Sequence, residues 1–240
     1  MRWRAMLVCL LAGCGSGRYD KAFEERLGVY RDEASLAALQ RSPITIGEAK
    51  RVRMRVPNQF DQLTGEGAAE ARPSFLEDFP GFAQAYTSGT GLTVRGEEVT
   101  PMLTVGVQPT ARGQSDVVRT AILAQVRADD ALETKDWEPR TVAAVAGGLR
   151  AWQRLVAKGG QFFDSVKAGN QEWKKWPGLA EIWVSAEPEQ EFCVVFALRV
   201  PEEAAVLLAP PLSEMAELIA RTVEIVPQEP GAAAAPADNP

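Results

Sequence analysis

The most restrictive feature of the chain is a run of ten residues, Glu191–Val200 (EFCVVFALRV), that is apolar almost throughout. A strand with one wet face alternates polar and apolar residues, whereas a continuous apolar run is typical of a strand covered on both faces. Pro201 follows and ends the run, because proline cannot donate a hydrogen bond to a neighbouring strand. The run therefore predicts a central strand in a sheet that is packed on both sides.

Two hairpins are predicted. One precedes the central strand in the sequence, and the other contains it. Thr141–Ala146 and Leu149–Val156 flank Gly147-Gly148, a pair that can take the positive φ angles of a two-residue turn. Ala180–Ser185 (AEIWVS) precedes the central run and is joined to it by five polar or turn-forming residues. Short connections of this kind join antiparallel neighbours.

Two further strands and two helices complete the predicted domain. The strands Arg51–Val56 (RVRMRV) and Val99–Val107 alternate, with Val52, Met54 and Val56 inward in the first. One helix is expected from a cap at Ser115 or Asp116 to about Ala128, with Val118, Ile122 and Val126 on its inner face. Another follows Pro211 and Ser213, with Met215, Leu218 and Ile219 inward. This order predicts an α+β domain, an antiparallel sheet with helices packed on it.

The stretch 61–82 reads as irregular, because Pro73, Pro80 and Gly81 interrupt it. It carries four large apolar side chains, Phe75, Leu76, Phe79 and Phe82. We expect them to bury against their own domain, with a partner protein as the alternative cover.

The N-terminal residues have the layout of an export signal. Arg2 and Arg4 give a positive start, Ala5–Leu11 (AMLVCLL) is apolar, and Ala12-Gly13 are small. The apolar part is too short to span a membrane as a permanent helix. The alternative is an ordinary export signal in which the cysteine at position 14 is incidental.

The quartet Leu11-Ala12-Gly13-Cys14 resembles a bacterial lipobox. The resemblance implies cleavage before Cys14, a diacylglyceryl thioether on its sulfur, and acylation of the new amino group with a fatty acid such as palmitate. Several chains on one residue give stable anchoring, whereas one chain is marginal. Gly15 favours the outer membrane over retention at the inner one. The expected location is the periplasmic face of a bacterial cell envelope.

These observations divide the chain into four segments. Residues 1–13 are the signal peptide, and 14–44 are a lipidated tether that holds either a stalk helix or the first helix of the domain. Residues 45–226 are a single α+β domain. Residues 227–240 (PQEPGAAAAPADNP) are a Pro/Ala tail without large apolar side chains, expected to be disordered.

The composition restricts the chemistry of the chain. It contains no histidine, which removes the usual general base, His-based zinc sites and every Ser-His-Asp arrangement. The net charge is −6, and an acidic protein is a poor candidate for nucleic acid. Of the three cysteines, Cys193 lies in the apolar run and is expected to be a buried hydrophobe. No disulfide, metal or cofactor is expected.

Five aromatic residues lie close together between positions 162 and 183: Phe162, Phe163, Trp173, Trp176 and Trp183. Phe162 and Trp183 are expected in the core. Trp173 and Trp176 enclose Lys174 and Lys175, and tryptophans beside lysines are typical of interface or headgroup anchors. For these two tryptophans we keep both readings, core and exposed contact. The four residues 173–176 are the candidate site for a partner protein or the membrane.

A carboxylate enzyme would need two acids at a defined separation, one with a raised pKa. The available acids fall in stretches read as loops or solvated ends: Glu66, Glu70, Glu77, Asp78, Glu97, Glu98, Asp129 and Asp130. Neither a calcium loop nor a phosphate-binding loop is present in the sequence. No catalytic residue is assigned.

The domain resembles the PsbP-like α/β/α sandwich. The resemblance rests on Arg55-Val56-Pro57 with Phe60, on Leu198–Pro201 (LRVP), and on a helix at 116–128 that leads to Trp137 and then to hairpins. That family includes a photosystem oxygen-evolving subunit, a Ran-binding import factor and the DcrB envelope lipoproteins. The strings at 160–163, 177–183 and 199–201 are also similar to uncharacterised lipoproteins of the planctomycete type. The resemblance covers about residues 45–226 and implies a mostly non-catalytic domain.

The sequence thus predicts a membrane-anchored envelope lipoprotein that acts as a binding or scaffold module. Its partners are the membrane, through Cys14, and an envelope protein. Two alternatives remain: a carrier of a small apolar ligand or lipid, which needs an apolar cavity, and a carboxylate-dependent envelope hydrolase, which needs a cleft with two acids.

Overall fold

The computed structural model describes residues 23, 34, 36–47, 50–111, 114–164, 175–186 and 191–226. Residues 1–37 and 38–240 form two compact units, and the fold described below is that of the second. This unit includes residues 38–44, which the sequence interpretation assigned to the tether. The predicted signal peptide, Cys14 and the C-terminal tail lie outside the described residues. No helix among the described residues is long and apolar enough to cross a membrane.

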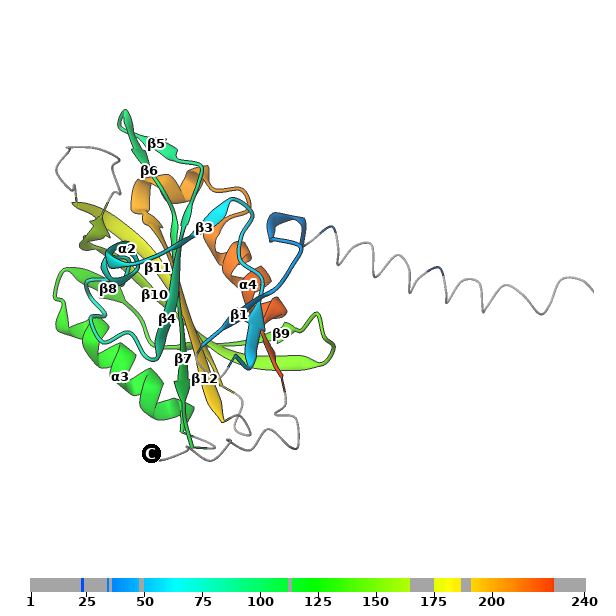
Figure 1. Cartoon of the computed structure of the whole chain (residues 1–240). Helices are drawn as coiled ribbons and strands as arrows, with labels where there is room; N and C mark the ends of the chain where they lie inside the picture. Colours follow the sequence, from blue (N-terminus) through cyan, green and yellow to red (C-terminus); the bar gives the residue numbers. More distant parts are fainter. Residues whose placement is uncertain are drawn as a thin grey trace, which may run out of the picture. The chain divides into compact units, whose positions relative to one another are not determined.

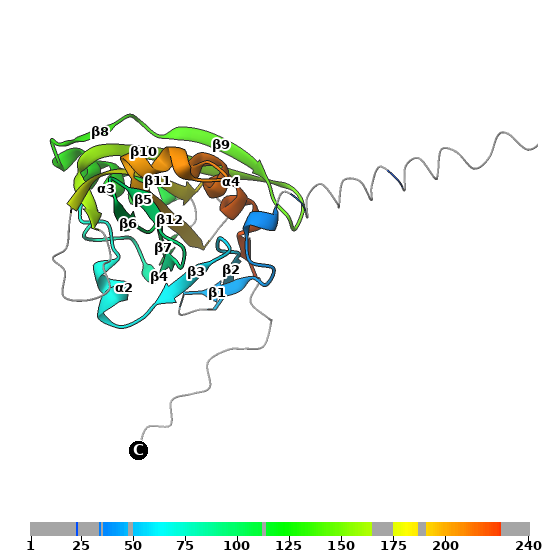
Figure 2. The same ribbon diagram turned by 90° about the horizontal axis from the view of Figure 1, so that it is seen from above.

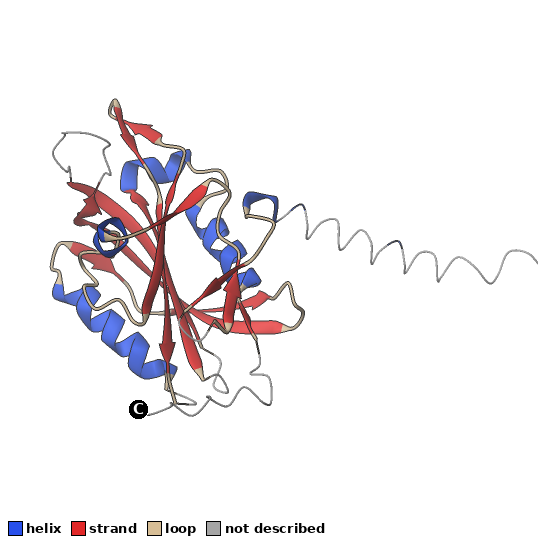
Figure 3. Cartoon of the chain, viewed as in Figure 1, coloured by secondary structure: helices blue, strands red, loops and turns tan. Residues whose placement is uncertain are grey.

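The described elements are mostly strands (Figures 1 and 3). The helical segments are η1 (Leu36–Ala38), α2 (Glu66–Glu70), α3 (Ser115–Ala128), η2 (Glu202–Leu207) and α4 (Leu212–Thr222). The strands are β1 (Ile44–Ile46), β2 (Val52–Met54), β3 (Phe60–Leu63), β4 (Phe82–Ser88), β5 (Leu92–Val94), β6 (Glu97–Val99), β7 (Met102–Pro109), β8 (Leu132–Thr134), β9 (Glu138–Ala143), β10 (Leu149–Asp164), β11 (Lys175–Ser185), β12 (Phe192–Pro201) and β13 (Glu224–Ile225).

Among the described residues, eight strands form one sheet in the order β3-β4-β7-β12-β11-β10-β8, with β9 also paired to β10. Every pairing in this sheet is antiparallel. The apolar run lies in β12, between β7 and β11, and all its residues from Cys193 to Pro201 are buried. The predictions of a central strand and of the α+β class are therefore confirmed.

Helices α3 and α4 cover opposite faces of this sheet (Figure 2). Val118, Ile122 and Val126 of α3 are buried, as predicted. In α4, Leu218 and Ile219 are buried, but Met215 is only half-buried. The Arg150 guanidinium of β10 donates to the Val223 carbonyl directly after α4, at 2.5 Å. Because alternate residues of a strand share a face, Trp152 and Arg154 lie on this α4 side too.

The predicted cap of α3 is wrong. The residue before the helix is Gln114, whose side chain makes no capping hydrogen bond, and Ser115 is already helical. Asp116 pairs instead with the Arg119 guanidinium one turn later. The Asp116 carboxylate therefore forms an ion pair, whereas a cap would have accepted a hydrogen bond from a backbone N–H of the first turn.

Both predicted hairpins form, but the two-residue turn at Gly147-Gly148 is wrong. β9 ends at Ala143, and the connection to Leu149 runs from Ala144 to Gly148, where the Ala144 N–H donates to the Gly148 carbonyl at 3.0 Å. β9 and β10 pair from Leu149 and Ala143 onward, and Gly147 and Gly148 have φ angles of +95° and +82°. β11 and β12 pair from Val184 and Val195 to Gly178 and Pro201. β10 is longer than predicted, since it runs to Asp164 and pairs with β8 as well.

The stretch 61–82 is more ordered than its composition indicated. It contains most of β3 and the helix α2, and Phe75, Leu76 and Phe79 are buried, as expected for packing within the domain. Tertiary contacts produce this order. The Ala71 carbonyl accepts hydrogen bonds from Thr104 Oγ1 at 3.0 Å and from the Arg199 guanidinium, both on strands of the main sheet.

A second, three-stranded sheet has the order β1-β2-β13. It confirms the alternating strand predicted around residues 51–56, where Val52, Met54 and Val56 are buried. β13 joins the C-terminal end of the described chain to this sheet, and the Val226 N–H donates to the Arg51 carbonyl at 2.7 Å.

Candidate functional site

The predicted contact residues 173–176 do not form one exposed cluster. Trp173 and Lys174 lie outside the described residues. Lys175 is exposed at the start of β11, but Trp176 is only 3% exposed and is therefore a core residue. The reason is the register of β10 and β11, which places Trp176 directly opposite Phe163. Phe163 is itself fully buried. The exposed-contact reading is therefore wrong for Trp176.

The core predictions for Phe162, Trp183 and Cys193 are confirmed, since all three are buried. Trp183 stacks on Phe196 with the ring centroids 6.0 Å apart. Burial raises the pKa of the Cys193 thiol to about 11. A thiol of such high pKa is a poor nucleophile at neutral pH.

The acids singled out in the sequence are spread over the surface of the described chain. Glu66, Glu77, Asp78, Glu98 and Asp130 are exposed, while Glu97 and Asp129 are half-buried. The side chain of Glu70 is not described. Within the described residues no group of three or more acidic or cysteine side chains is placed to hold a metal ion.

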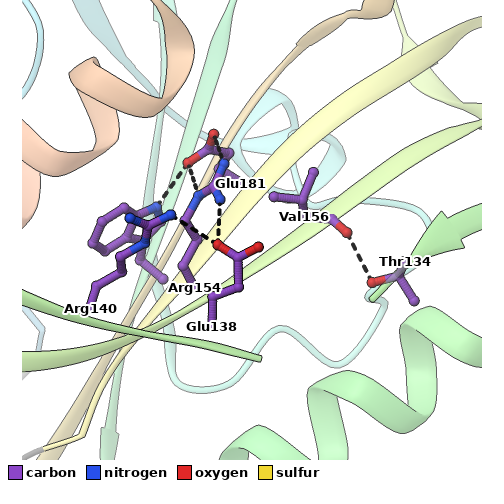
Figure 4. A network of polar contacts seen from close by, with 7 residues as sticks. Thr134, Glu138, Arg140, Arg154, Val156 and Glu181 are labelled. Carbon is purple, nitrogen blue, oxygen red and sulfur yellow. Dashed lines mark hydrogen bonds and ion pairs between the residues drawn. The ribbon is translucent and has the colours of Figure 1, made fainter. Parts of the chain in front are cut away.

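Sequence reasoning missed a different set of charges, which we call the ionic cluster: Glu138, Arg140, Arg154 and Glu181 (Figure 4). Arg154 lies between two carboxylates from neighbouring strands. Its Nε and Nη2 donate to the two oxygens of Glu181 at 2.9 and 2.7 Å, and its Nη1 donates to Glu138 Oε2 at 2.9 Å. Arg140 donates to the same Glu138 oxygen at 2.9 Å. One guanidinium thus connects β9, β10 and β11.

The ionic cluster is buried at one end and open at the other. The side chain of Glu181 is 4% exposed and that of Arg154 is 15% exposed, whereas Glu138 is 45% exposed. Trp183 Nε1 donates to Glu181 Oε2 at 3.1 Å, so the buried carboxylate receives three donors. A buried carboxylate needs this compensation, because the loss of hydration otherwise costs several kcal/mol.

The pKa shifts of Arg154 and Glu138 favour the charged form of each group. The hydrogen bond with Glu181 raises the pKa of the Arg154 guanidinium, against the effect of burial. Hydrogen bonds from Arg154 and then Arg140 lower the pKa of the Glu138 carboxyl. A general acid requires a raised carboxyl pKa. The ionic cluster is therefore suited to holding three strands together and unsuited to acid catalysis at Glu138.

A pattern in the sequence could have indicated the ionic cluster. Arg154 is two residues from the buried Trp152 in β10, and Glu181 is two residues from the buried Trp183 in β11. Each charged residue therefore lies on the same face of its strand as a buried tryptophan. A charged residue at a core-facing position needs a partner. The identity of the partner is not readable, because Arg154 and Glu181 are 27 positions apart.

At the other edge of the sheet the structure has an open groove of about 470 Å³ that sequence reasoning also missed. We call it the amide groove, because three glutamines line it. Gln62 of β3 and Gln84 of β4 are two of them, and Gln40 lies before β1. The remaining lining is Ile44, Thr45, Phe60, Asp61 and Tyr86.

Two hydrogen bonds within the amide groove orient its amides. Tyr86 Oη donates to Gln84 Oε1. Gln40 Nε2 donates to the Phe60 carbonyl at 3.0 Å. Burial raises the pKa of Tyr86 to about 12, so its hydroxyl stays protonated at neutral pH and remains a donor. In the described part of the chain, the side chains of Thr45, Asp61 and Gln62 make no hydrogen bond or ion pair.

The ionic cluster and the amide groove lie on the same face of the sheet. In an antiparallel sheet, residues directly opposite each other point to the same side. One row of such pairs crosses six strands from the groove to the cluster: Gln84, Val105, Phe196, Trp183, Arg154 and Glu138. Buried apolar side chains separate the two polar regions.

No protein-family model matches the chain, and no curated protein matches its sequence. Solved structures with a similar fold exist. LpqN of Mycobacterium tuberculosis, involved in cell envelope biogenesis, is 11% identical with a TM-score of 0.42, over 79% of this chain and 92% of that one. Cyanobacterial PsbP from Synechocystis is 12% identical with a TM-score of 0.38, over 79% and 93%.

The Saccharomyces cerevisiae Ran-binding protein Mog1p is 13% identical with a TM-score of 0.42, over 78% of this chain and 96% of that one. A Bacteroides thetaiotaomicron protein is 8% identical with a TM-score of 0.40, over 78% of this chain and 48% of its own length, so the chain spans about half of it. At these identities and TM-scores none of the four transfers a site or a function.

Proposed function

We propose that the protein is a lipid-anchored lipoprotein of a bacterial cell envelope and that its α+β domain is a binding module. The observation that carries the proposal is the segment from Arg2 to Cys14, in which charge, an apolar run, small residues and a cysteine follow in the order of a lipoprotein signal. The lipid on Cys14 would hold the domain at the periplasmic face of a membrane, and Gly15 favours the outer one.

The amide groove supports the role of a binding module. It is open, it has the volume of a small-molecule site, and it presents side chains that have no partner in the described part of the chain. The side chains of Thr45, Asp61 and Gln62 are available to a ligand, whereas the paired groups of the ionic cluster are occupied. A domain held at the membrane surface by its lipid would offer this groove to molecules of the envelope.

The two alternative functions receive less support. A carrier of an apolar ligand needs an apolar cavity, but the groove is lined mainly by amide, hydroxyl and carboxylate groups. A carboxylate hydrolase needs two cooperating acids, one with a raised pKa. Glu138 and Glu181 are both bound to Arg154, and the pKa of Glu138 is lowered.

The anchor is tested by the mass of the natural N-terminus. The full chain is expressed in a bacterium with lipoprotein processing, and its N-terminal peptide is analysed by mass spectrometry. We expect a peptide that begins at Cys14 and carries three fatty acyl chains. The Cys14→Ser variant should lack the lipid and leave the membrane fraction, while Cys9→Ser, the matched control, should be processed normally. An unmodified, uncleaved N-terminus would contradict the anchor.

The binding role is tested in the envelope itself. Mild crosslinking of cells followed by affinity purification of the lipidated protein should return an envelope protein or an envelope glycan. Purification from cells that express the Cys14→Ser variant is the control for contacts that do not depend on the anchor. A crosslinked sample without any envelope component would contradict the role.

A further inference from the structure

The amide groove has an unusual balance of donors and acceptors, and this balance indicates its ligand. Gln84 accepts a hydrogen bond from Tyr86 through Oε1, which leaves its NH2 group to donate. Gln40 donates through Nε2, which leaves its Oε1 to accept. Thr45 and Gln62 can each do both. A ligand in the groove therefore meets donors and acceptors side by side.

The charge of the groove argues against anionic ligands. Its described lining contains one charged side chain, the carboxylate of Asp61, and neither lysine nor arginine. Phosphate and carboxylate groups are bound chiefly by arginine, by lysine or by helix N-termini. Asp61 would repel an anion and would accept hydrogen bonds from hydroxyl groups.

The apolar part of the groove is small. Ile44 and the aromatic residues Phe60 and Tyr86 provide it, and both rings are largely buried. An acyl chain needs an apolar enclosure, which this lining does not form. The lining that remains open to a ligand is mainly polar.

We propose that the amide groove is a binding site for a neutral, hydroxyl-rich ligand, a short saccharide. Each sugar hydroxyl donates and accepts at once, which matches the paired functions of Gln40, Gln62 and Gln84. The volume of about 470 Å³ lies within the range of about 300–1,000 Å³ that small-ligand pockets occupy. This assignment names the ligand class of the proposed binding module and rests on that function, but it does not depend on the anchor at Cys14.

The proposal is tested by ligand-observed NMR on the full chain. The detergent must have no sugar head group, for example lauryldimethylamine oxide, because a glycoside detergent would compete. The saccharide probes are glucose, N-acetylglucosamine, maltose and N,N′-diacetylchitobiose. The other probes are inorganic phosphate, palmitate and trialanine. We expect saturation transfer to at least one saccharide and none to trialanine. The ³¹P line of phosphate should not broaden when the protein is added, and palmitate should show no more transfer than in protein-free micelles.

Variants locate the binding. The double variant Thr45→Ala/Gln62→Ala removes two side chains that have no partner in the described chain, so its fold should be unchanged. Two lost hydrogen bonds should weaken saccharide binding by about tenfold. The matched control is Thr141→Ala/Gln161→Ala, which removes an exposed threonine and an exposed glutamine outside the groove. It should bind as the natural chain does.

Three results would overturn the proposal. They are the absence of binding to every saccharide, binding of phosphate, palmitate or trialanine in place of the saccharides, and equal saccharide binding by both double variants. Circular dichroism of each variant shows that a loss of binding is not a loss of fold. The lipid on Cys14 is read from the N-terminal mass, so failure of the anchor and failure of the saccharide site give different results.

Discussion

The ionic cluster and the amide groove share one face of one sheet, yet their polar groups are used in opposite ways. In the cluster, Arg154 binds Glu138 and Glu181, and Trp183 adds a further donor to Glu181. In the groove, Thr45 and Gln62 have no partner in the described part of the chain. The buried cluster must be paired because buried charge is costly, whereas the open groove can leave its groups to water or to a ligand.

The comparison separates stability from binding. A paired buried charge contributes to the fold only while its partner is present, so removal of one partner should strongly destabilise the protein. An unpaired exposed amide contributes little to the fold, so its removal should affect only what binds there. The following four predictions test this division, in order of decreasing effect on stability.

The largest effect is expected from Arg154→Met. It leaves the buried Glu181 carboxylate without its main partner, which should lower the free energy of unfolding by about 3 kcal/mol in urea titrations. Arg140→Met is the matched control. Because Arg140 is exposed, this substitution should lower the free energy of unfolding by at most about 1 kcal/mol. The double variant Arg154→Met/Glu181→Met should recover most of the loss. Equal stability of Arg154→Met and the natural chain would remove the distinction between cluster and groove.

The next effect concerns Tyr86 at alkaline pH. Burial raises the pKa of Tyr86 from 10.0 to about 12, so the folded protein favours the neutral phenol. This contribution is present below pH 10 and is lost as the pH rises from about 10 to 12. Its size is about 2 kcal/mol. Urea titrations at pH 9 and pH 12 should show a smaller decline for Tyr86→Phe, which cannot ionise, than for the natural chain. An equal decline in both would show that Tyr86 ionises as a solvated residue.

A smaller effect is expected at the open end of the ionic cluster. Hydrogen bonds from Arg154 and Arg140 lower the pKa of Glu138, so its contribution is present above its ordinary value of 4.5 and is lost as the pH falls. Glu138→Gln should cost about 0.5 kcal/mol at pH 7 and almost nothing at pH 3. Thermal unfolding at both pH values measures the difference. A pH-independent cost would show that the carboxylate charge of Glu138 has no role.

The smallest effect on stability is expected in the amide groove. Thr45→Ala/Gln62→Ala should change the free energy of unfolding by at most about 0.5 kcal/mol, although it weakens saccharide binding. Urea titration of this variant beside Thr141→Ala/Gln161→Ala gives the comparison. A destabilisation as large as that of Arg154→Met would mean that the groove is structural.

The parts of the fold that were predictable from the sequence are those encoded by neighbouring residues. The apolar run of β12 and the Gly147-Gly148 pair carry their own signals, because burial on both faces and positive φ angles restrict the residue type locally. The stretch 61–82 has no such signal, and its order depends on Thr104 and Arg199, which contact it from distant strands.

The candidate sites also depended on contacts between residues that are distant in the sequence. Trp176 and its flanking lysines resembled an exposed anchor in the sequence, but the register of β10 and β11 buries the tryptophan opposite Phe163. The amide groove could not be read from the chain, because its glutamines come from three separate segments. Each of these residues by itself is typical of an ordinary surface.

By its own residues, the sequence determined a central strand, two hairpins, an antiparallel α+β class and a chain without histidine. It also gave the lipoprotein-like segment at Cys14, which remains a prediction. Only the tertiary structure decided which charges meet at Arg154 and which amides meet at the groove. The physical reason is that hydrophobic runs and turns act over a few residues, whereas a salt bridge or a groove needs the registers of several strands at once.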